Sequence, residues 1–424
     1  MIDLLALEEL PGYPGDPKRE KPMRVLVDTN HRCAGNNLWS ARLAAWVRAN
    51  GHELVWEVEQ AEVLLLNACG VTHEAQDHEL ALVEAYRRRL PGGSKIVVFG
   101  CLPGIAPERL RGVEAIGFAE TARLEALLGG TVPLESLPAA SAGAPIETLK
   151  TAKDGHLRAE GLLVDGWRSR LPFLLPSLLA YALPRVRSRL DRLLVELALG
   201  GRAHLEIGSG CSARCSYCLI RKAKGKVRSR SIETILHDLD TLPPEEPVAL
   251  VADDCGSYGQ DLGLDLVHLL EAIGKHRPGI ALDLTYLNPA ALLTLEARLF
   301  VALRSVRLRS AVIPLQSGSA TVLKGMRRDY DPNEVLASLH RLRALHPETV
   351  LVSHLIIGFP GEGWREFFRS VATLPSYDFT AVFAYAPPGR ASTHHPWDRC
   401  RVFGRLAFLT LVQNLWYSLR LLRG

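Results

Sequence analysis

The hydrophobic pattern of the first 120 residues alternates between short apolar runs and longer amphipathic stretches. The apolar runs predict strands at Arg24–Asp28, Glu53–Glu57, Ala61–Asn67 and Lys95–Gly100, and the amphipathic stretches predict helices at Leu38–Asn50 and Glu74–Leu90. Strands that alternate with helices are typical of a parallel sheet, whose ligand-binding residues lie at the carboxyl ends of the strands. We therefore expect an α/β, Rossmann-like domain over residues 1–130.

A second alternating series runs from residue 203 to residue 399. It predicts strands at His204–Ile207, Val248–Ala252, Ala281–Leu284, Ser305–Arg307, Ala311–Pro314, Leu351–Ile357 and Ala381–Tyr385. Helical patterns between them cover Ser231–Asp240, Asp265–His276, Pro332–Leu345 and Trp364–Leu374. Repeated strand–helix units of this kind predict a full or partial barrel.

The residues between and after these two units have a different character. Residues 130–155 are rich in Pro, Ala, Ser, Gly and Thr and predict a linker. In the insertion Leu157–Gly201, an apolar stretch at Leu171–Leu183 precedes a basic amphipathic helix, RVRSRLDRLLVELALGG. Residues 131–202 are therefore expected to form a linker and insertion, and residues 400–424 one C-terminal helix, Cys400–Arg423.

Composition narrows the class of protein. A hydrophobic fraction of 47% and a charged fraction of 23% exclude a disordered chain. The net charge of +4 argues against a protein that grips nucleic acid over its whole surface, so any basic patch must be local. The N-terminus lacks a secretory signal, and prolines interrupt the longest apolar stretch, Leu171–Pro184, so no membrane partner is expected. We expect a cytoplasmic protein, whose eight cysteines are metal ligands or buried residues rather than disulfides.

Three cysteines with C-x3-C-x2-C spacing, Cys211, Cys215 and Cys218, directly follow the first strand of the predicted barrel. Three thiolates can hold a 4Fe–4S cluster and leave the fourth iron open. S-adenosylmethionine can bind such an iron through its amino and carboxylate groups and be cleaved reductively to a 5′-deoxyadenosyl radical. A zinc knuckle, which needs a fourth Cys or His, and buried thiols are the alternatives. The spacing favours the cluster.

This spacing, with an aromatic residue directly before the third cysteine, resembles the radical SAM superfamily. The surrounding segment, GCSARCSYCLIRKAKGKVRSRS, resembles the cluster loop of its methylthiotransferase family. Five further segments resemble motifs of that family in the same order: DDCGSYGQD (253–261), TYLNP (285–289), PLQSGSATVLKGMRRDY (314–330), LIIGFPGE (355–362) and FAYAPPGRAST (383–393). The resemblance implies a radical SAM partial (β/α)6 barrel over residues 203–399.

Three more cysteines, Cys33, Cys69 and Cys101, each follow a predicted strand of the first domain. Taken alone, cysteines this far apart are better interpreted as core thiols. The resemblance implies instead that they hold a second, auxiliary 4Fe–4S cluster. The segment TNHRCAGNN differs from the T-x-G-C-Q-x-N that is usual in the family, which leaves room for an altered geometry near Cys33.

The resemblance also implies a binding site for S-adenosylmethionine. The implied residues are Tyr217, Asp253, Asp254, Gln316, Ser317, Gly318, Ser319, Gly358, Phe359 and Pro360. The glycines could equally belong to plain tight turns, and the two aspartates could be solvated carboxylates at a strand end. Cys255 and Cys400 match no ligand position, and no catalytic residue is expected beyond the cluster ligands.

Basic side chains gather around the cysteine triplet, at Arg214, Arg221, Lys222, Lys224, Lys226, Arg228 and Arg230. They could hold tRNA phosphates or an acidic peptide, or they could balance two anionic clusters, which is the interpretation we favour. Arg228 and Arg230 are the candidates for substrate binding.

Methylthiotransferases convert a C–H bond to C–S–CH3, and the resemblance implies this transferase activity with two 4Fe–4S clusters and S-adenosylmethionine. A reducing partner of the flavodoxin or ferredoxin type and a sulfur donor are expected. Family members act on a tRNA adenosine or on an aspartate of a ribosomal protein, and usually carry a TRAM domain, which is not expected here. The insertion could form a peptide groove or an interdomain packing element. The sequence therefore predicts a peptide or protein substrate, such as a ribosomally made precursor peptide. A tRNA adenosine and a different radical SAM reaction are the alternatives.

Overall fold

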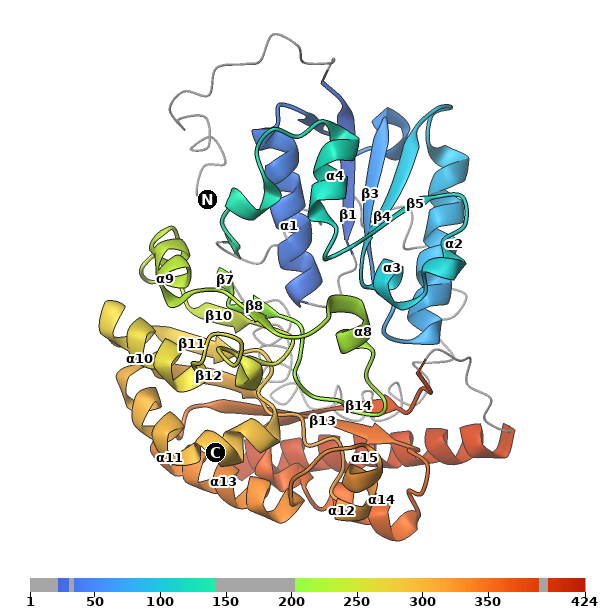
Figure 1. Cartoon of the computed structure of the whole chain (residues 1–424). Helices are drawn as coiled ribbons and strands as arrows, with labels where there is room; N and C mark the ends of the chain where they lie inside the picture. The colour runs from blue at the N-terminus through green and yellow to red at the C-terminus, as the bar shows by residue number, and fades with distance from the viewer. Residues whose placement is uncertain (1–21, 30–33, 142–202, 389–395, 424) are drawn as a thin grey trace.

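The computed structural model describes residues 22–29, 34–141, 203–388 and 396–423, which form two α/β units (Figure 1). Each unit is built around its own parallel sheet with its own buried core. The Rossmann-like unit and the partial barrel are both confirmed. The insertion predictions at 157–201, the apolar stretch and the basic helix, lie outside the described residues.

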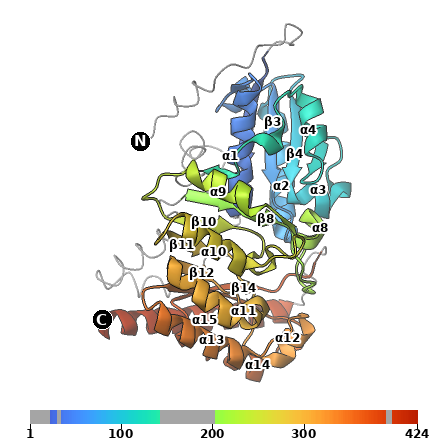
Figure 2. The same ribbon diagram turned by 60° about the vertical axis from the view of Figure 1, so that its left-hand side comes forward.

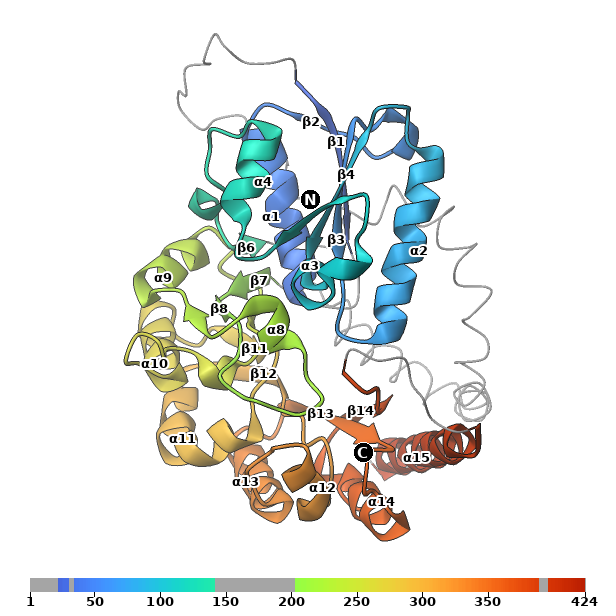
Figure 3. The ribbon, with the colours of Figure 1, turned by 45° about the vertical axis from the view of Figure 1, so that its right-hand side comes forward.

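The first unit is a five-stranded parallel sheet in the order β2-β1-β3-β4-β5. Its elements are β1 (Arg24–Thr29), α1 (Ala34–Ala49), β2 (Glu53–Leu54), β3 (Val63–Ala68), α2 (His73–Arg89), β4 (Lys95–Gly100), α3 (Cys101–Ile105), β5 (Glu114–Gly117) and α4 (Thr121–Leu128). Helices α1 and α4 cover one face of the sheet and α2 the other (Figure 3). Covering on both faces explains why β3 is apolar at nearly every position and fully buried.

The second unit is a seven-stranded sheet in the order β14-β13-β12-β11-β10-β7-β6. Its strands are β6 (Ala140–Ser141), β7 (Ala203–Glu206), β10 (Val248–Val251), β11 (Ala281–Leu284), β12 (Arg307–Val312), β13 (Val350–Ile357) and β14 (Phe379–Ala384). Six strands are parallel, and β6 pairs antiparallel with β7. The sheet is therefore a partial barrel with one added edge strand.

Helices cover the outer face of this curved sheet (Figure 1). They are α9 (Ile232–Asp240), α10 (Leu266–His276), α11 (Pro289–Ala302), α13 (Pro332–Leu345), α14 (Trp364–Val371) and α15 (Pro396–Arg423), with the short α12 (Ala320–Gly325) at one end. Side chains alternate along each strand, so that Leu205 and Leu355 join the core under the helices, while Glu206 and His354 point to the inner face.

Several boundaries differ from the sequence prediction. The two strands predicted at 305–307 and 311–314 are one strand, β12, because its residues pair continuously with β11 through a register shift. The strand predicted at 53–57 is reduced to two residues. The predicted linker begins with ordered structure, since Ala140 pairs with Leu205 of the barrel sheet. Strand β5 and helix α11 were not predicted.

The two units contact each other through a pair of short helices, α3 from the first and α8 (Ile220–Lys224) from the second (Figures 1 and 3). Ala223 of α8 belongs to the buried core of the first unit. A Cβ at Gly104 of α3 would lie 2.8 Å from the carbonyl oxygen of Ala223. The two helices therefore approach backbone to backbone at Gly104, and the turned view shows α8 beside α3 below the first sheet (Figure 2).

Candidate functional site

The loop that carries the cysteine triplet leaves β7 at the carboxyl edge of the barrel sheet. A two-stranded ribbon, β8 (Gly208–Ser209) with β9 (Arg228–Ser229), closes its base. Gly210 has a φ of 78°, and a Cβ there would collide with the carbonyl oxygen of Lys226. Only glycine fits this position, which starts the turn directly before Cys211.

The three thiols of this loop are close enough to interact electrostatically. The N–H of Cys218 donates to the carbonyl oxygen of Cys215 at 3.2 Å, which folds the C-x2-C segment into a turn. Burial raises the pKa of Cys211 to about 12, and the nearby Asp254 carboxylate adds to the rise. Burial also raises the pKa of Cys218.

Such thiols suit a metal cluster. They stay protonated at neutral pH unless a nearby positive charge stabilises the thiolates, and metal coordination supplies that charge. Within the parts of the chain that the structure describes, no three Cys, His, Asp or Glu side chains are close enough to chelate a single metal ion. By residue type and C-x3-C-x2-C spacing, Cys211, Cys215 and Cys218 fit the donor set of an iron–sulfur cluster with one open iron.

Asp253 and Asp254 both follow β10, but their carboxylates have different partners. Asp253 accepts the N–H of Gly210 at 2.9 Å and pairs with Nζ of the buried Lys224 at 2.9 Å. Asp254 accepts the Ser257 hydroxyl at 2.7 Å and lies 4.0 Å from Sγ of Cys211. Asp253 thus holds the base of the cluster loop, while Asp254 faces a cluster ligand directly.

Tyr217, between the second and third cysteines, is held by a partly buried arginine, Arg328, that the sequence analysis did not single out. Nε and one terminal nitrogen of Arg328 donate to the Tyr217 hydroxyl at 3.1 and 2.7 Å. Its other terminal nitrogen donates to Asn288 Oδ1 at 3.0 Å. Tyr217 and Asn288, the two partners of Arg328, both lie in segments that resemble family motifs. Those segments were the sequence signal that could have pointed to this contact. Arg328 therefore links the cluster loop to the ends of two barrel segments.

Gly318 and Gly358, two of the residues implied to bind S-adenosylmethionine, have close protein neighbours. A Cβ at Gly318 would collide with the carbonyl of Arg369 in α14, and the Gly318 N–H donates to Ser370 Oγ at 2.9 Å. Gly358 has a φ of 84°, and a Cβ there would lie 2.6 Å from Val402 of α15. Because these two glycines have no side chain, α14 can pack closely against the turn at Gly318 and α15 against the turn at Gly358.

The remaining predicted cofactor residues gather at the carboxyl ends of β12 and β13. Gln316 has a φ of 66° and bridges to Leu355, and Ser317 caps the turn by accepting the Ser319 N–H at 3.2 Å. The buried Ser319 hydroxyl has no protein partner among the described residues, so it can serve a bound ligand. Phe359 packs edge-to-face on Tyr385 with ring centroids 4.9 Å apart, and Pro360 is exposed beside it.

Cys69 and Cys101 lie at one edge of the first sheet, just beyond β3 and β4, and both are buried. Cys33 lies outside the described residues. Asn36, three residues further along, brings its Oδ1 to 3.9 Å from Sγ of Cys101, and its carbonyl accepts from Asn67 at 2.7 Å. The start of α1 is therefore beside Cys101, as a shared site for the three cysteines requires.

Four of the basic residues around the triplet are engaged within the protein. Arg221 donates to the Ser212 carbonyl at 2.9 Å, Lys222 to the Ile105 carbonyl, and Lys224 pairs with Asp253. Arg230 bonds Asp238 at 2.7 Å. Arg228, by contrast, is exposed on β9. Of the two candidates for substrate binding, Arg228 is the one whose side chain faces solvent.

An aromatic ladder, formed by Tyr286, His354 and Phe383, lies on the inner face of the barrel. The ring centroids are 5.8 Å apart between Tyr286 and His354 and 5.3 Å apart between His354 and Phe383, both edge-to-face. Burial lowers the pKa of His354 to about 4, so the imidazole is neutral, while Phe383 is 49% exposed. The sequence could not place these three rings together because they come from separate segments: the loop after β11, strand β13 and strand β14.

Comparison with known proteins agrees with this geometry. Residues 205–374 match the radical SAM superfamily, and residues 26–116 match the uncharacterized protein family UPF0004. No helix among the described residues has the length and apolar character needed to cross a bilayer.

Curated relatives cover most of the chain. A probable threonylcarbamoyladenosine tRNA methylthiotransferase of Pyrococcus abyssi is 28% identical over 87% of this chain and 78% of its own length. The ribosomal protein uS12 methylthiotransferase RimO of Syntrophus aciditrophicus is 29% identical over 84% of this chain and 73% of its own. The threonylcarbamoyladenosine tRNA methylthiotransferase of Xenopus laevis is 27% identical over 84% of this chain, which spans 59% of that protein's length.

Among solved structures, the cobalamin-dependent S-adenosylmethionine radical enzyme OxsB superposes with a TM-score of 0.50 at 13% identity, over 91% of this chain and 55% of that one. This likeness supports the fold alone. The cysteine triplet, the motifs in family order and the relatives along both units together place the chain in the radical SAM methylthiotransferase family of transferases.

Proposed function

We propose that this chain is a two-cluster methylthiotransferase, which converts a C–H bond of its substrate to C–S–CH3. Cys211, Cys215 and Cys218 would hold the radical SAM cluster, and Cys33, Cys69 and Cys101 the auxiliary one. The observation that carries the proposal is the contact between α3, which begins at Cys101, and α8, which begins two residues after Cys218. This contact supports the proposal because it brings Cys101 and the loop of the cysteine triplet to one interface between the units.

When bound, the clusters and S-adenosylmethionine supply the radical, the sulfur and the methyl group. The protein's residues hold these groups in place. Arg328 fixes Tyr217 next to the cluster ligands, Asp253 fixes the glycine that precedes Cys211, and the Ser319 hydroxyl can accept or donate a hydrogen bond to the cofactor. A reducing partner of the flavodoxin or ferredoxin type and a sulfur donor complete the proposal.

Two substrates are candidates. A peptide or protein agrees with the low net charge, and one relative is named for ribosomal protein uS12. A tRNA adenosine is supported by relatives named for tRNA and by the aromatic ladder, because the half-exposed Phe383 ring on the inner face offers a stacking surface for a base. The residues expected to form a peptide groove lie in 157–201, outside the described chain.

Iron and sulfide analysis of the reconstituted protein tests the cluster count. We expect about eight irons per chain, four for each cluster. A value of four in fully reconstituted protein would contradict the two-cluster proposal. The variant with Ala at Cys211, Cys215 and Cys218 should form no 5′-deoxyadenosine, whereas the variant with Ala at Cys69 and Cys101 should still form it and yield no methylthio product.

Mass spectrometry identifies the substrate class. Digests of tRNA nucleosides and of peptides, from cells with the active chain and from cells with the triple Ala variant, should differ by one species that is heavier by about 46 Da, the mass of SCH3 replacing H. Finding it in nucleosides supports the tRNA candidate, and finding it in peptides supports the protein candidate. A product without added sulfur would indicate a different radical SAM reaction.

A further inference from the structure

A buried ionic contact joins the two units at a distance along the chain from the cysteines. Glu206, the last residue of β7, is 8% exposed. Its Oε1 accepts the indole N–H of Trp39 at 3.0 Å, and its Oε2 lies 3.9 Å from a guanidinium nitrogen of Arg42. Trp39 and Arg42 both belong to α1 of the first unit, so a barrel carboxylate is satisfied by the other unit.

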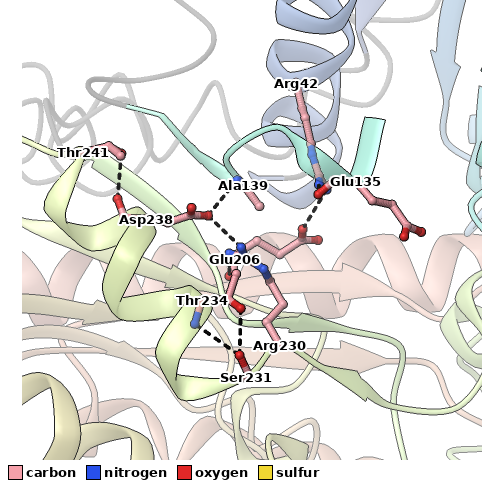
Figure 4. Close-up of polar contacts among 9 residues, drawn as sticks. All are labelled: Arg42, Glu135, Ala139, Glu206, Arg230, Ser231, Thr234, Asp238 and Thr241. Atoms are coloured by element: carbon pink, nitrogen blue, oxygen red, sulfur yellow. Dashed lines mark hydrogen bonds and ion pairs between the residues drawn. The ribbon is translucent and has the colours of Figure 1, made fainter. Parts of the chain in front are cut away.

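The same network extends into the barrel (Figure 4). Arg230 donates to the backbone carbonyl of Glu206 at 3.0 Å and to Asp238 Oδ2 at 2.7 Å. Asp238 Oδ2 also accepts the N–H of Ala139, next to β6, at 2.9 Å. Five segments of the chain therefore meet at one buried cluster of charges: α1, the residues before β6, β7, the residues after β9, and α9.

This network lies between the segments that support the two cysteine sets. The Trp39 ring packs on Phe99 with centroids 5.7 Å apart, and Phe99 is two residues before Cys101. Glu206 is five residues before Cys211. A displacement of α1 relative to β7 would therefore be passed to both cysteine-bearing edges.

A second buried contact runs in parallel. Nζ of Lys224 lies 4.9 Å from the ring centroid of Phe118 in the first unit and pairs with Asp253 in the barrel. Asp253 in turn accepts the N–H of Gly210, directly before Cys211. The two connections meet at Phe118, whose ring packs edge-to-face on Trp39 with centroids 5.4 Å apart, and both lead from the core of the first unit toward the cluster loop.

We propose that Glu206, together with Arg42 and Trp39, is a positioning device that fixes the auxiliary cysteine set relative to the radical SAM set. This inference rests on the proposed function. Forming the 5′-deoxyadenosyl radical requires only the barrel site, whereas transfer of sulfur requires both sites at one substrate carbon. A buried ion pair has one favourable geometry and a large penalty when a partner is lost, so it resists sliding that an apolar contact would tolerate.

The ratio of methylthio product to 5′-deoxyadenosine measures this positioning. Glu206→Gln keeps an oxygen acceptor for the Trp39 indole but leaves the Arg42 guanidinium without its counter-ion. Arg42→Gln leaves the Glu206 carboxylate without its counter-ion. For each single variant we expect the ratio to fall by on the order of 100-fold while 5′-deoxyadenosine still forms, because ångström displacements between reacting groups have effects of this size. The double variant, which removes both buried charges, should recover much of the ratio.

Glu135→Gln is the matched control. The Glu135 side chain is exposed, Arg42 donates only to its backbone carbonyl, and its carboxylate is the weakest of the electrostatic influences on Arg42, so removing this solvated charge should change the ratio far less than Glu206→Gln does. Should Glu206→Gln fail to fold, Trp39→Phe removes a single N–H donor and should lower the ratio less. Hydrogen–deuterium exchange in the metal-free protein supplies a readout that needs no activity: the single variants should exchange faster in α1 and β7.

Faster exchange with an unchanged ratio would overturn the positioning role. Equal losses of 5′-deoxyadenosine and of product would also overturn it, since they would indicate damage to the barrel site alone. If the wild-type protein forms 5′-deoxyadenosine without any methylthio product, the proposed function fails instead. The exchange comparison would then still decide whether Glu206 holds the two units together.

Discussion

Asp253 and Asp254 are neighbours in the sequence, yet one binds a backbone amide and a lysine while the other faces a cluster thiol. The sequence predicted both as cofactor residues because both follow a strand in a family motif. It could not separate them, since the direction of each side chain depends on the turn that Gly256 and Ser257 complete after Asp254. The cysteines of the triplet, by contrast, could be singled out from their spacing alone, and their role as cluster ligands stays a prediction.

Asp254→Asn should speed alkylation of Cys211 in the metal-free protein. The Asp254 carboxylate helps to raise the pKa of this thiol to about 12, so removing the negative charge should lower the pKa and increase the thiolate fraction between pH 7 and pH 10. Iodoacetamide labelling followed by peptide mass spectrometry measures the rate. Cys218 is the internal control, because burial, Cys215 and Asp253 rather than Asp254 raise its pKa. An unchanged rate at Cys211 would mean that burial alone suppresses its reactivity.

Phe383→Ala should weaken substrate binding if the substrate is a nucleoside. Base–aromatic stacking contributes about 1–3 kcal/mol per base, so KM should rise roughly 10-fold or more while the maximal rate changes little. Phe368→Ala is the control, since Phe368 is similarly exposed but lies on α14, on the outer side of the sheet. Equal KM values for the two variants would remove the support that the ladder gives to a tRNA substrate.

Helices and strands with a regular hydrophobic period could be predicted from the sequence, whereas elements held by irregular packing contacts could not. Strands β4 and β11 and helix α13 have the predicted bounds, because their apolar positions follow one period without interruption. Helices α3 and α8, only five residues each, carry no such period, and their importance comes from packing on each other. The two short helices that join the units were therefore among the elements that the sequence did not predict.

Gly104→Ala should destabilise the contact between α3 and α8. The added methyl group would lie 2.8 Å from the Ala223 carbonyl oxygen, and overpacking of this kind costs about 1–3 kcal/mol. Thermal unfolding should show a lower Tm. Gly404→Ala is the matched control in another helix, where no atom lies within 4 Å of the added Cβ, and helix propensity should raise stability by about 1 kcal/mol. Similar shifts in both variants would contradict close packing at Gly104.

The whole molecule places the carboxyl edges of two parallel sheets at one interface (Figure 3). The presence of two α/β units followed from the repeated strand–helix pattern. The way the units dock did not follow from this pattern, because docking depends on contacts such as that between Trp39 and Glu206, which are 167 residues apart in the chain. Such a pair leaves no local signal in a single sequence.

If both clusters assemble, their spins should interact. We expect the electron paramagnetic resonance spectrum of the reduced wild-type protein to be broadened, and its relaxation accelerated, relative to the sum of two single-cluster variants, since the two cysteine sets flank contacting helices. The variants with Ala at Cys69 and Cys101, and with Ala at Cys211, Cys215 and Cys218, supply the two reference spectra. A wild-type spectrum equal to their simple sum would place the clusters too far apart for direct transfer.

The last helix, α15, reaches the turn at 358–362 from outside the sheet. Val402 fills the space beside Gly358, while Arg405 donates to the Glu362 carbonyl at 3.1 Å, pairs with its carboxylate at 3.0 Å and lies over the Trp364 ring. We therefore expect a fusion partner, affinity tag or crosslink that displaces α15 to shift the turn at 358–362, which includes Phe359. A change to this helix should thus alter the turn that carries Phe359, more than forty residues earlier in the chain.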